Sequence, residues 1–481
     1  MLPEFVERVD CVIGDSVERA MSAHHRRRLR RVGWAGALSA RDAGWAEGAE
    51  PATQGNAIDV LVDGEEALPR IAEAIAGARK HVHIAGWCIT PEFALTTGEP
   101  PAILRDVLAD AARRIPVRVL LWGGAPLPLY PVSRRSVRAT RDALCKGNGI
   151  VCALDTHERP LHCHHEKLVI IDDELAFVGG IDLTSFTGNR LDRAGHPPRG
   201  SLGWHDVATR IRGPAVASVA RHFGLRWNEA AGERLPAPAE QAAAGDAELQ
   251  IVRTVPERIY KALPRGEFSI LESYAGALRS AERLIYLENQ FLWSAEIVEI
   301  LRDKLLNPPS ERFRLLLVPP AKPNSGADDT SGQLGRLADA DDGADRLLAC
   351  TRFAVAGGAS ERVYVHAKVG IVDDRWLTIG SANLNEHSLF NDTEMNVVSH
   401  DPALARATRL RLWGEHLDRP ADALEDDPAG VIDELWRPLA SDQLERRRAG
   451  APLTHGLVRL PHVSRRSKRL LGPLQSLLVD G

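Results

Sequence analysis

The 481-residue chain contains few cysteines, few aromatic side chains and no long apolar run. A membrane-spanning helix needs ~20 consecutive apolar residues. The longest apolar stretches, such as residues 167–180, are interrupted by Asp172, Asp173 and Glu174. The six cysteines are scattered and form no CxxC pair. This pattern argues against a small disulfide scaffold and favours reduced thiols in a cytoplasmic protein.

An excess of positive charge is also missing. Lys and Arg number 60 against 65 Asp and Glu, so the formal net charge is −5 and no overall basic character points to nucleic acid. Hydrophobic residues make up 44% and charged residues 26%, which is typical of a folded globular protein. The N-terminus opens with acidic residues and lacks a signal-peptide pattern, so we expect a cytoplasmic location.

Helical and strand patterns alternate along the chain. Residues 68–78 and 103–113 have apolar side chains at helical spacing, whereas residues 80–87 and 117–122 have the composition of strands. The alternation predicts an α/β fold with a mixed or parallel sheet flanked by helices.

The order of these patterns recurs roughly 200 residues later, because residues 74–84 resemble 277–287 and residues 117–122 resemble 313–318. We therefore expect two similar halves related by a pseudo-two-fold axis, with one shared cleft. The predicted organisation is a peripheral segment 1–50, a first half 51–235, a linker 236–264, a second half 265–420 and a C-terminal extension 421–481 with a basic tail. The acidic segment 324–345 is expected to form a long surface loop.

Each half carries one copy of the pattern H-x-K-x4-D. The copies are His165, Lys167 and Asp172 in the first half and His366, Lys368 and Asp373 in the second. Small residues and a polar side chain follow each copy, namely Gly179, Gly180 and Asp182, and Gly380, Ser381 and Asn383. Alternate residues of a strand share a face, so the His and Lys of each copy are expected to point into one cleft.

Two imidazoles and two ammonium groups in one cleft suit a phosphodiester substrate. The lysines neutralise its charge, and the histidines supply a nucleophile and a proton donor near pH 7. The glycines permit close approach of the backbone to a ligand.

These residues resemble the phospholipase D superfamily, whose signature is a duplicated HxKx4D motif, over about residues 55–420. Flanking segments resemble the phosphatidylcholine-type phospholipases D in particular. These segments are His164-His165, Trp204-His205-Asp206, Leu287-Glu288-Asn289-Gln290-Phe291 and Asp392-Thr393-Glu394.

The resemblance implies a covalent phosphohistidine on His165, with His366 as the general acid and then the general base. In the family an acidic residue downstream of each motif orients the imidazole, and Asp206 and Glu394 stand at the matching positions. The lysines supply the positive charge, so no metal or cofactor is expected. The two motif aspartates are left with either a structural or a chemical role.

The implied reaction is hydrolysis of a glycerophospholipid such as phosphatidylcholine to phosphatidic acid and the head-group alcohol. An alcohol in place of water would give transphosphatidylation. Substrate contacts are expected from Gly179, Gly180, Gly380, Ser381 and Asn383. Asp182 replaces the Asn of many family members, and its carboxylate would repel phosphate directly.

The expected partners are phospholipid at a membrane surface and water or alcohol as acceptor, with no nucleic acid. A monomer is expected, because one chain holds both half-sites. The basic residues of 446–469, followed by an apolar end, suit peripheral contact with an anionic membrane.

Four rival interpretations remain. A cardiolipin-synthase-like phosphatidyltransferase would use the same residues. The N-terminal membrane-spanning helices expected of such an enzyme are not evident in this sequence, which counts against it. A phosphodiesterase nuclease is disfavoured by the net charge, and a binding module without catalysis by the intact motifs. A zinc site is suggested by the cluster His157, His162, Cys163, His164 and His165. Only alternate strand residues converge, which leaves a tetrahedral site short of ligands.

Overall fold

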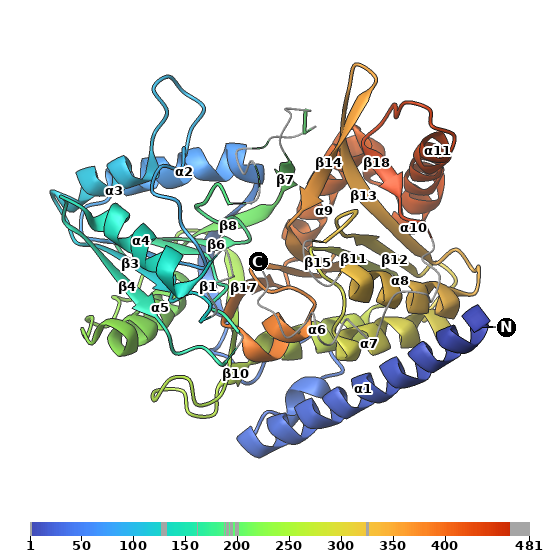
Figure 1. Cartoon of the computed structure of the whole chain (residues 1–481), viewed down its shortest axis with the longest axis horizontal. Helices are drawn as coiled ribbons and strands as arrows, with labels where there is room; N and C mark the ends of the chain where they lie inside the picture. Colours follow the sequence, from blue (N-terminus) through green and yellow to red (C-terminus); the bar gives the residue numbers. More distant parts are fainter. Residues whose placement is uncertain are drawn as a thin grey trace.

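The computed structural model describes residues 2–126, 132–160, 162–186, 188, 192, 196–197, 202–323 and 327–461. Its architecture is a pair of similar mixed sheets flanked by helices, as the α/β prediction requires (Figure 1). None of the described helices is long and apolar enough to cross a membrane. Residues 462–481, which include much of the expected basic tail, lie outside the described part of the chain.

The first sheet is built from seven strands. In spatial order they are β4 (Ile150–Asp155), β3 (Val117–Trp122), β2 (Val82–Gly86), β5 (Leu168–Ile171), β6 (Leu175–Gly179), β8 (Val207–Arg212) and β1 (Thr53–Val62). Strands β4, β3 and β2 are parallel, and the remaining pairs are antiparallel.

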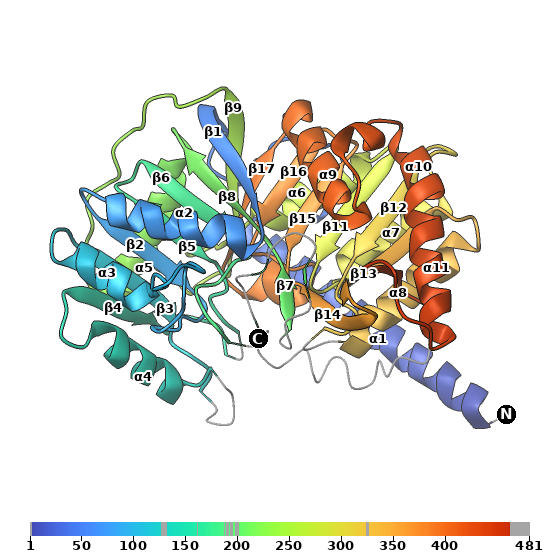
Figure 2. The same cartoon turned by 90° about the horizontal axis from the view of Figure 1, so that it is seen from above.

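The second sheet repeats this order and these directions. Its strands are β13 (Leu347–Ala356), β12 (Arg314–Val318), β11 (Leu284–Asn289), β15 (Lys368–Val372), β16 (Trp376–Gly380), β17 (Glu394–Ser399) and β9 (Ala247–Val255). The sheets meet where β1 pairs with β9, and Figure 2 shows them side by side about these strands. The weak sequence repeat therefore corresponds to a repeated order of strands.

Four short or outlying strands complete the pairing. They are β7 (Gly203–His205), β10 (Glu267–Phe268), β14 (Ala359–Val365) and β18 (Leu457–Arg459). Strand β7 from the first half runs parallel to β14 from the second half, so the two halves are hydrogen-bonded beyond the central sheet contact.

Helices cover both sheets. Beside the first sheet lie α2 (Asp63–Gly77), α3 (Leu104–Ala112), α4 (Arg134–Cys145) and α5 (Val216–Ala231). Beside the second lie α6 (Ser269–Ser280), α7 (Ala295–Leu306), α8 (Ala327–Asp341), α9 (Pro402–Leu417), α10 (Pro428–Val431) and α11 (Arg437–Arg448). The N-terminal helix α1 (Leu2–Val32) runs beneath the second half, along α7 (Figure 1). Short helical turns span Ala35–Leu38, His387–Asn391, Ala421–Leu424 and Ile432–Trp436.

The apolar composition of the motif strands explains their position. All residues of β5 and of β15 are buried. Strands covered by helices on both faces need such continuous apolar runs rather than an alternating pattern. The two motifs therefore stand at the ends of central, rigid strands.

Two expectations about connecting segments were wrong. Residues 327–341 of the expected loop form α8, because Leu334, Leu337 and Ala340 are spaced to share one buried face. Strand β9 stands within the segment that was expected to be only a linker, and its Leu249 and Ile251 are buried.

Candidate active site

The two H-x-K segments lead directly into β5 and β15, and each is hydrogen-bonded to the opposite half. The backbone N–H of His165 donates to the carbonyl oxygen of Thr393 at 2.9 Å. The N–H of His366 donates to the carbonyl oxygen of His205 at 2.8 Å. Each histidine is thus tied to the segment that carries the other half's acidic residue.

The carboxylates consequently bind the imidazoles across the halves. Glu394, from the second half, lies 3.0 Å from Nδ1 of His165. Asp206, from the first half, lies 2.7 Å from Nδ1 of His366. A carboxylate on Nδ1 fixes the ring's orientation and stabilises its protonated form, so the chemistry falls to Nε2. The motif spacing did not predict this crossed pairing.

The first imidazole is held neutral. Burial, with repulsion from Lys167 and Lys368, lowers the pKa of His165 to about 3. Burial also raises the pKa of Glu394 to about 8, against the opposing effects of Lys167 and of hydrogen bonds from Ser381 and other hydroxyls. Both shifts disfavour the charged forms of the ring and of the carboxyl group in the free protein. A neutral imidazole is the form that can attack phosphorus.

The Glu394 carboxylate is fixed by two hydroxyl groups. Ser388 donates to its Oε1 at 2.6 Å, and Ser381 donates to its Oε2. Ser381 thus holds the carboxyl group of Glu394, and its predicted contact with substrate stays a prediction. Sequence reasoning missed Ser388, which carries no motif signal of its own.

The lysines occupy buried polar positions beside the histidines. Nζ of Lys167 donates to the carbonyl oxygen of His165 at 2.6 Å and pairs with Asp182 at 3.3 Å. Nζ of Lys368 donates to Gln290 Oε1 at 2.9 Å. Burial, together with repulsion from Lys167, lowers the pKa of Lys368 to about 7. A bound phosphodiester would favour the charged form of Lys368.

The polar residues after the two motifs lie next to these lysines. Asn383 Nδ2 is 3.4 Å from Gln290 Oε1, and Gln290 thereby links Asn383 to Lys368. Asp182 Oδ1 and Asn383 Oδ1 are buried without a hydrogen-bond partner among the described residues. Gln290 lies in the quoted segment 287–291 but was not singled out from it.

The glycines after the motifs make room for neighbouring protein atoms. A Cβ on Gly180 would lie 2.1 Å from Oδ1 of Asp206, and one on Gly179 would lie 2.4 Å from Cα of Ala208. A Cβ on Gly380 would lie 2.1 Å from Oδ1 of Asn396. Close approach therefore occurs between strands and to the orienting carboxylate. Contact of these glycines with substrate stays a prediction.

The motif aspartates lie away from the imidazoles. Seven residues of extended chain, about 20 Å, separate each from its histidine. Asp172 accepts hydrogen bonds from the N–H groups of residues 79–81, at 2.6 to 3.2 Å. Asp373 accepts from residues 282–284 at 2.7 to 2.8 Å. These contacts with backbone N–H groups favour the structural role for both aspartates, and a catalytic role for them stays a prediction.

One tryptophan lies beside each motif imidazole. The ring of Trp87 is 6.4 Å from that of His165, and the ring of Trp204 is 4.6 Å from that of His366. Both tryptophans are buried. They form apolar walls against the two rings.

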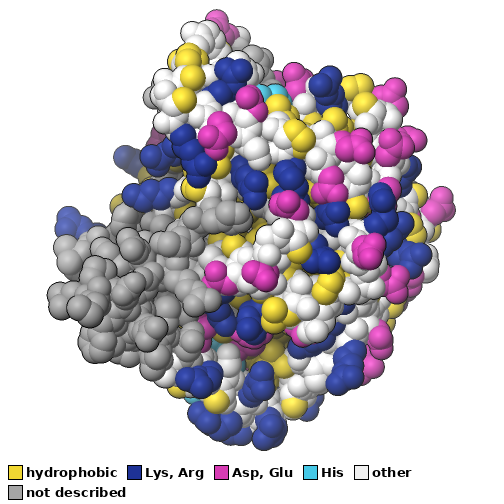
Figure 3. Space-filling view, turned by 90° about the vertical axis from the view of Figure 1, so that its right-hand side faces the viewer, with side chains coloured by type: hydrophobic (Ala, Val, Ile, Leu, Met, Phe, Trp, Pro, Cys, Tyr) yellow, Lys and Arg dark blue, Asp and Glu magenta, His cyan; other side chains and the backbone are white. Residues whose placement is uncertain are grey.

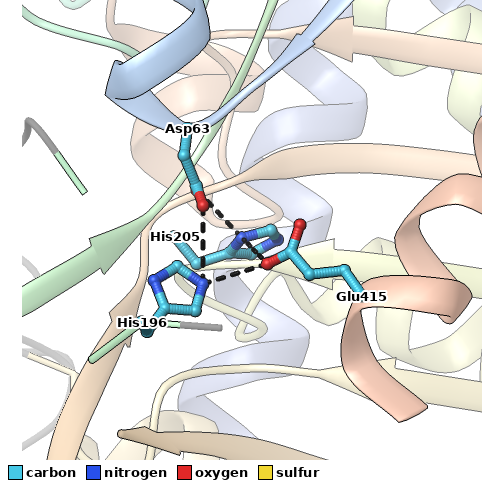
Figure 4. Close-up of side chains that lie close together, drawn as sticks. All are labelled: Asp63, His196, His205 and Glu415. Atoms are coloured by element: carbon cyan, nitrogen blue, oxygen red, sulfur yellow. Dashed lines mark hydrogen bonds and ion pairs between the residues drawn. The ribbon is translucent and has the colours of Figure 1, made fainter. Parts of the chain in front are cut away.

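A separate cluster of ligand-type side chains lies beside the second half-site (Figure 4). His205 Nδ1 is 3.1 Å from Asp63, and His196 Nε2 is 3.1 Å from Glu415. Burial lowers the pKa of His196, but Asp63, Asp192 and Glu415 outweigh it and raise that pKa to about 8. Two imidazoles and two carboxylates are ligand types for a divalent cation, and they also neutralise one another as ion pairs.

Comparisons with known proteins agree with this geometry. Residues 277–412 match the family model described as "Cardiolipin synthase, PLD-like domain". Phospholipase D A of Dictyostelium discoideum is 25% identical, over 75% of this chain and 35% of that protein. Major cardiolipin synthase ClsA of Bacillus subtilis is 24% identical, over 76% of this chain and 73% of that protein. The chain spans about a third of the length of the first phospholipase D relatives it matches.

A solved structure shows the same fold. The phosphatidylserine synthase of Haemophilus influenzae Rd KW20 superposes with a TM-score of 0.52 at 11% identity, covering 82% of this chain and 93% of that one. The duplicated sheets, the paired motifs at the ends of β5 and β15 and the curated relatives together lead to one assignment. These findings support membership of the phospholipase D superfamily.

Proposed function

We propose that the protein is a phospholipase D-type phosphodiesterase that cleaves glycerophospholipids such as phosphatidylcholine. The products are phosphatidic acid and the head-group alcohol. The observation that carries the proposal is the crossed pairing of each motif histidine with a carboxylate of the other half. That arrangement builds one two-histidine centre from two separate motifs.

The first step forms a covalent intermediate. Nε2 of neutral His165 attacks phosphorus, and the N–P bond forms as the bond from phosphorus to the head-group oxygen breaks. His366, in its protonated form, gives its Nε2 proton to the leaving oxygen. Lys167 and Lys368 neutralise the charge on the phosphoryl oxygens in the transition state.

The second step releases the lipid. Water gives a proton to the now neutral His366 and attacks phosphorus, and the N–P bond to His165 breaks. A primary alcohol follows the same course and yields a new phosphatidyl ester. The acceptor molecule, water or alcohol, decides between hydrolysis and transfer, because the same side chains act in both reactions.

A phosphatidyltransferase of the cardiolipin synthase kind is the second candidate. The match to the Bacillus subtilis enzyme over 73% of its length favours it. Its acceptor would be the primary hydroxyl of phosphatidylglycerol. A nuclease is less favoured, because positive and negative side chains are interspersed on the face in Figure 3 and the net charge is −5.

We infer a monomer that acts at the membrane surface, with both half-sites supplied by one chain. The boundaries 51–235 and 265–420 are kept as proposed limits of the two halves. Residues 446–461 are part of the fold, because β18 pairs with β13 and Arg446 pairs with Asp442. Membrane contact by the basic tail would therefore fall to residues 462–481.

Mixed phospholipid vesicles with ethanol test this function. We expect phosphatidylethanol beside phosphatidic acid, and loss of both products with His165→Ala. Cardiolipin formed from phosphatidylglycerol, with no phosphatidylethanol, would favour the transferase. Cleavage of DNA without any lipid product would contradict the proposal.

A further inference from the structure

Three side chains from the two halves meet close to the active site. Nδ1 of His162 lies 2.9 Å from Nδ1 of His387 and 3.4 Å from Oδ1 of Asp392. One potential ligand atom from each residue lies within 4.8 Å of the other two. We call His162, His387 and Asp392 the bridging trio. It plays no part in the reaction proposed above.

The local fold explains how two of the three come together. Residues His387–Asn391 form a π-helical turn, and the N–H of Asp392 donates to the carbonyl oxygen of His387 at 2.8 Å. This wider turn brings residues five positions apart to one side of the chain. Single π-helical turns of this kind are frequent at functional sites.

The carboxylate of Asp392 points to an incomplete site. Asp392 is 1% exposed, and its Oδ2 has no hydrogen-bond partner among the described residues. Its Oδ1 accepts the N–H of Cys163 at 2.9 Å. A buried carboxylate oxygen without a partner is costly, and a cation removes that cost. His162 keeps 17% of its side chain exposed, which leaves one side of the trio open to solvent.

We propose that the bridging trio binds a divalent transition-metal ion of the Zn²⁺ class, with water as the fourth ligand. Imidazoles select such ions, whereas Ca²⁺ and Mg²⁺ prefer oxygen ligands alone. Metal–ligand bonds of ~2.0–2.1 Å in a tetrahedron place ligand atoms about 3.4 Å apart. The 3.4 Å distance from Nδ1 of His162 to Oδ1 of Asp392 already fits, so Oδ1 would be the oxygen that binds the ion.

Binding requires one local adjustment. The two Nδ1 atoms must separate by about 0.4 Å to reach tetrahedral spacing, which breaks their mutual hydrogen bond. The ring that donates in that bond moves its proton from Nδ1 to Nε2, so both Nδ1 lone pairs face the ion. The net charge of the protein groups is unchanged.

Two arginines and one glutamate lie next to the trio. Arg28, from α1, donates to Asn391 Oδ1 at 2.8 Å and to the carbonyl oxygen of Phe390 at 2.7 Å, next to the trio. Its guanidinium also pairs with Glu257 at 2.7 Å. Arg159 pairs with the same carboxylate at 2.6 Å. Two guanidinium groups therefore share one carboxylate, and the negative charge of Asp392 can offset the remaining positive charge near the trio.

The ion would position the segments that carry His165 and Glu394 and would take no part in the reaction itself. His162 precedes His165 by three residues, and Asp392 precedes Glu394 by two. A metal bridge between these segments would fix the distance between the nucleophile and the carboxylate that orients it. The expected consequence is a more stable junction between the halves.

The sequence concealed this site because its ligands come from distant segments. The rival zinc interpretation combined His162 with its sequence neighbours in the first half, but His157 and His164 turn to Asp155 instead, at 2.9 and 3.3 Å. The second half supplies two of the three ligands of the trio, at the π-helical turn and directly after it.

A Co²⁺ titration of the full chain after chelation and desalting tests the proposal. We expect visible absorption bands of tetrahedral Co²⁺, and one fewer bound equivalent with His162→Gln or His387→Gln than in the native protein. His157→Gln is the matched control from the same sequence cluster and should bind as the native protein does. Equal stoichiometry and equal spectra in all four proteins would overturn the proposal, whatever ions bind elsewhere.

Thermal unfolding gives a second readout that is independent of lipid cleavage. Added Zn²⁺ should raise the Tm of the native protein and of His157→Gln by the same amount. The rise should be smaller in His162→Gln and His387→Gln. A rise of equal size in all four proteins would assign the stabilisation to another site and contradict the bridging role.

Discussion

Glu394 in the second half binds Nδ1 of His165 in the first half at 3.0 Å. This contact makes the proposed nucleophile of one half dependent on a strand of the other. The reverse contact, from Asp206 to His366, makes the proposed proton donor dependent on the first half in the same way. Neither half therefore holds a complete catalytic unit.

The crossed pairs predict how carboxylate variants respond to the leaving group. Asp206→Asn impairs His366, the proton donor, so p-nitrophenol should still leave its phosphodiester quickly because that leaving group needs little protonation. A burst of p-nitrophenol should follow, since the second step still needs His366. Glu394→Gln impairs His165 and should slow release by roughly 10²- to 10⁴-fold without a burst. Stopped-flow absorbance decides, and a burst in Glu394→Gln alone would reverse the assignment.

A substitution at Gly180 should also cause loss of activity, by displacing Asp206 from His366. In Gly180→Ala the new Cβ would lie 2.1 Å from Oδ1 of Asp206 and would push that carboxylate away from His366. We expect turnover of phosphatidylcholine to fall by roughly 10²-fold or more while the circular dichroism stays native. Gly224→Ala, in α5 with open space around its Cβ, is the control and should raise stability by about 0.5–1 kcal/mol. Full activity in Gly180→Ala would show that Asp206 does not orient His366.

Asp373 should matter for stability and not for chemistry. Its carboxylate accepts three backbone N–H groups ahead of β11. Asp373→Ala should lower the free energy of unfolding by roughly 1–3 kcal/mol, because these donors lose their acceptor. The exposed Asp426→Ala should change it by less than about 0.5 kcal/mol. Urea unfolding measures both, and a large fall in kcat of folded Asp373→Ala would restore a chemical role.

Lys368 sets the expected dependence on pH. Its pKa in the free protein is lowered to about 7 by burial and by Lys167. The neutral form dominates above that value and binds phosphate poorly, so kcat/KM should fall as pH rises through about 7. His165 stays neutral down to about pH 3 and should cause no loss on the acid side near its ordinary pKa.

Lys368→Arg separates the lysine from the histidine that must also be protonated. The guanidinium stays charged, so the fall near pH 7 should shift to higher pH, although the overall rate will be lower. An unchanged fall in this variant would assign it to His366 and contradict the role given to Lys368.

Much of the fold was readable from the sequence, because the strands and helices of each half carry strong local patterns. The apolar run after His165 forms β5, which is fully buried. Segment 327–341 was misjudged because its charges obscured the buried face of Leu334 and Leu337. Strand β9 was missed because its pairing with β17 depends on residues far away in sequence.

The site was predictable only in part for the same reason. A motif reveals which residues lie in one segment, but not which segment of the other half faces it. The pairing of Glu394 with His165, the meeting of His162 with His387, and the turn of Asp172 to backbone N–H groups are all tertiary facts. Ser388 reaches Glu394 from the π-helical turn, which no local propensity indicated.

The most direct test of the account is to trap the covalent intermediate. We predict that His366→Ala, mixed with an activated phosphodiester such as a p-nitrophenyl ester of phosphatidic acid, gains one phosphatidyl group. Intact mass spectrometry at neutral or alkaline pH, followed by peptide mapping, should place that group on His165. His165→Ala should gain none. An adduct on His366 in the His165→Ala variant, with none on His165, would contradict the assignment of the two histidines.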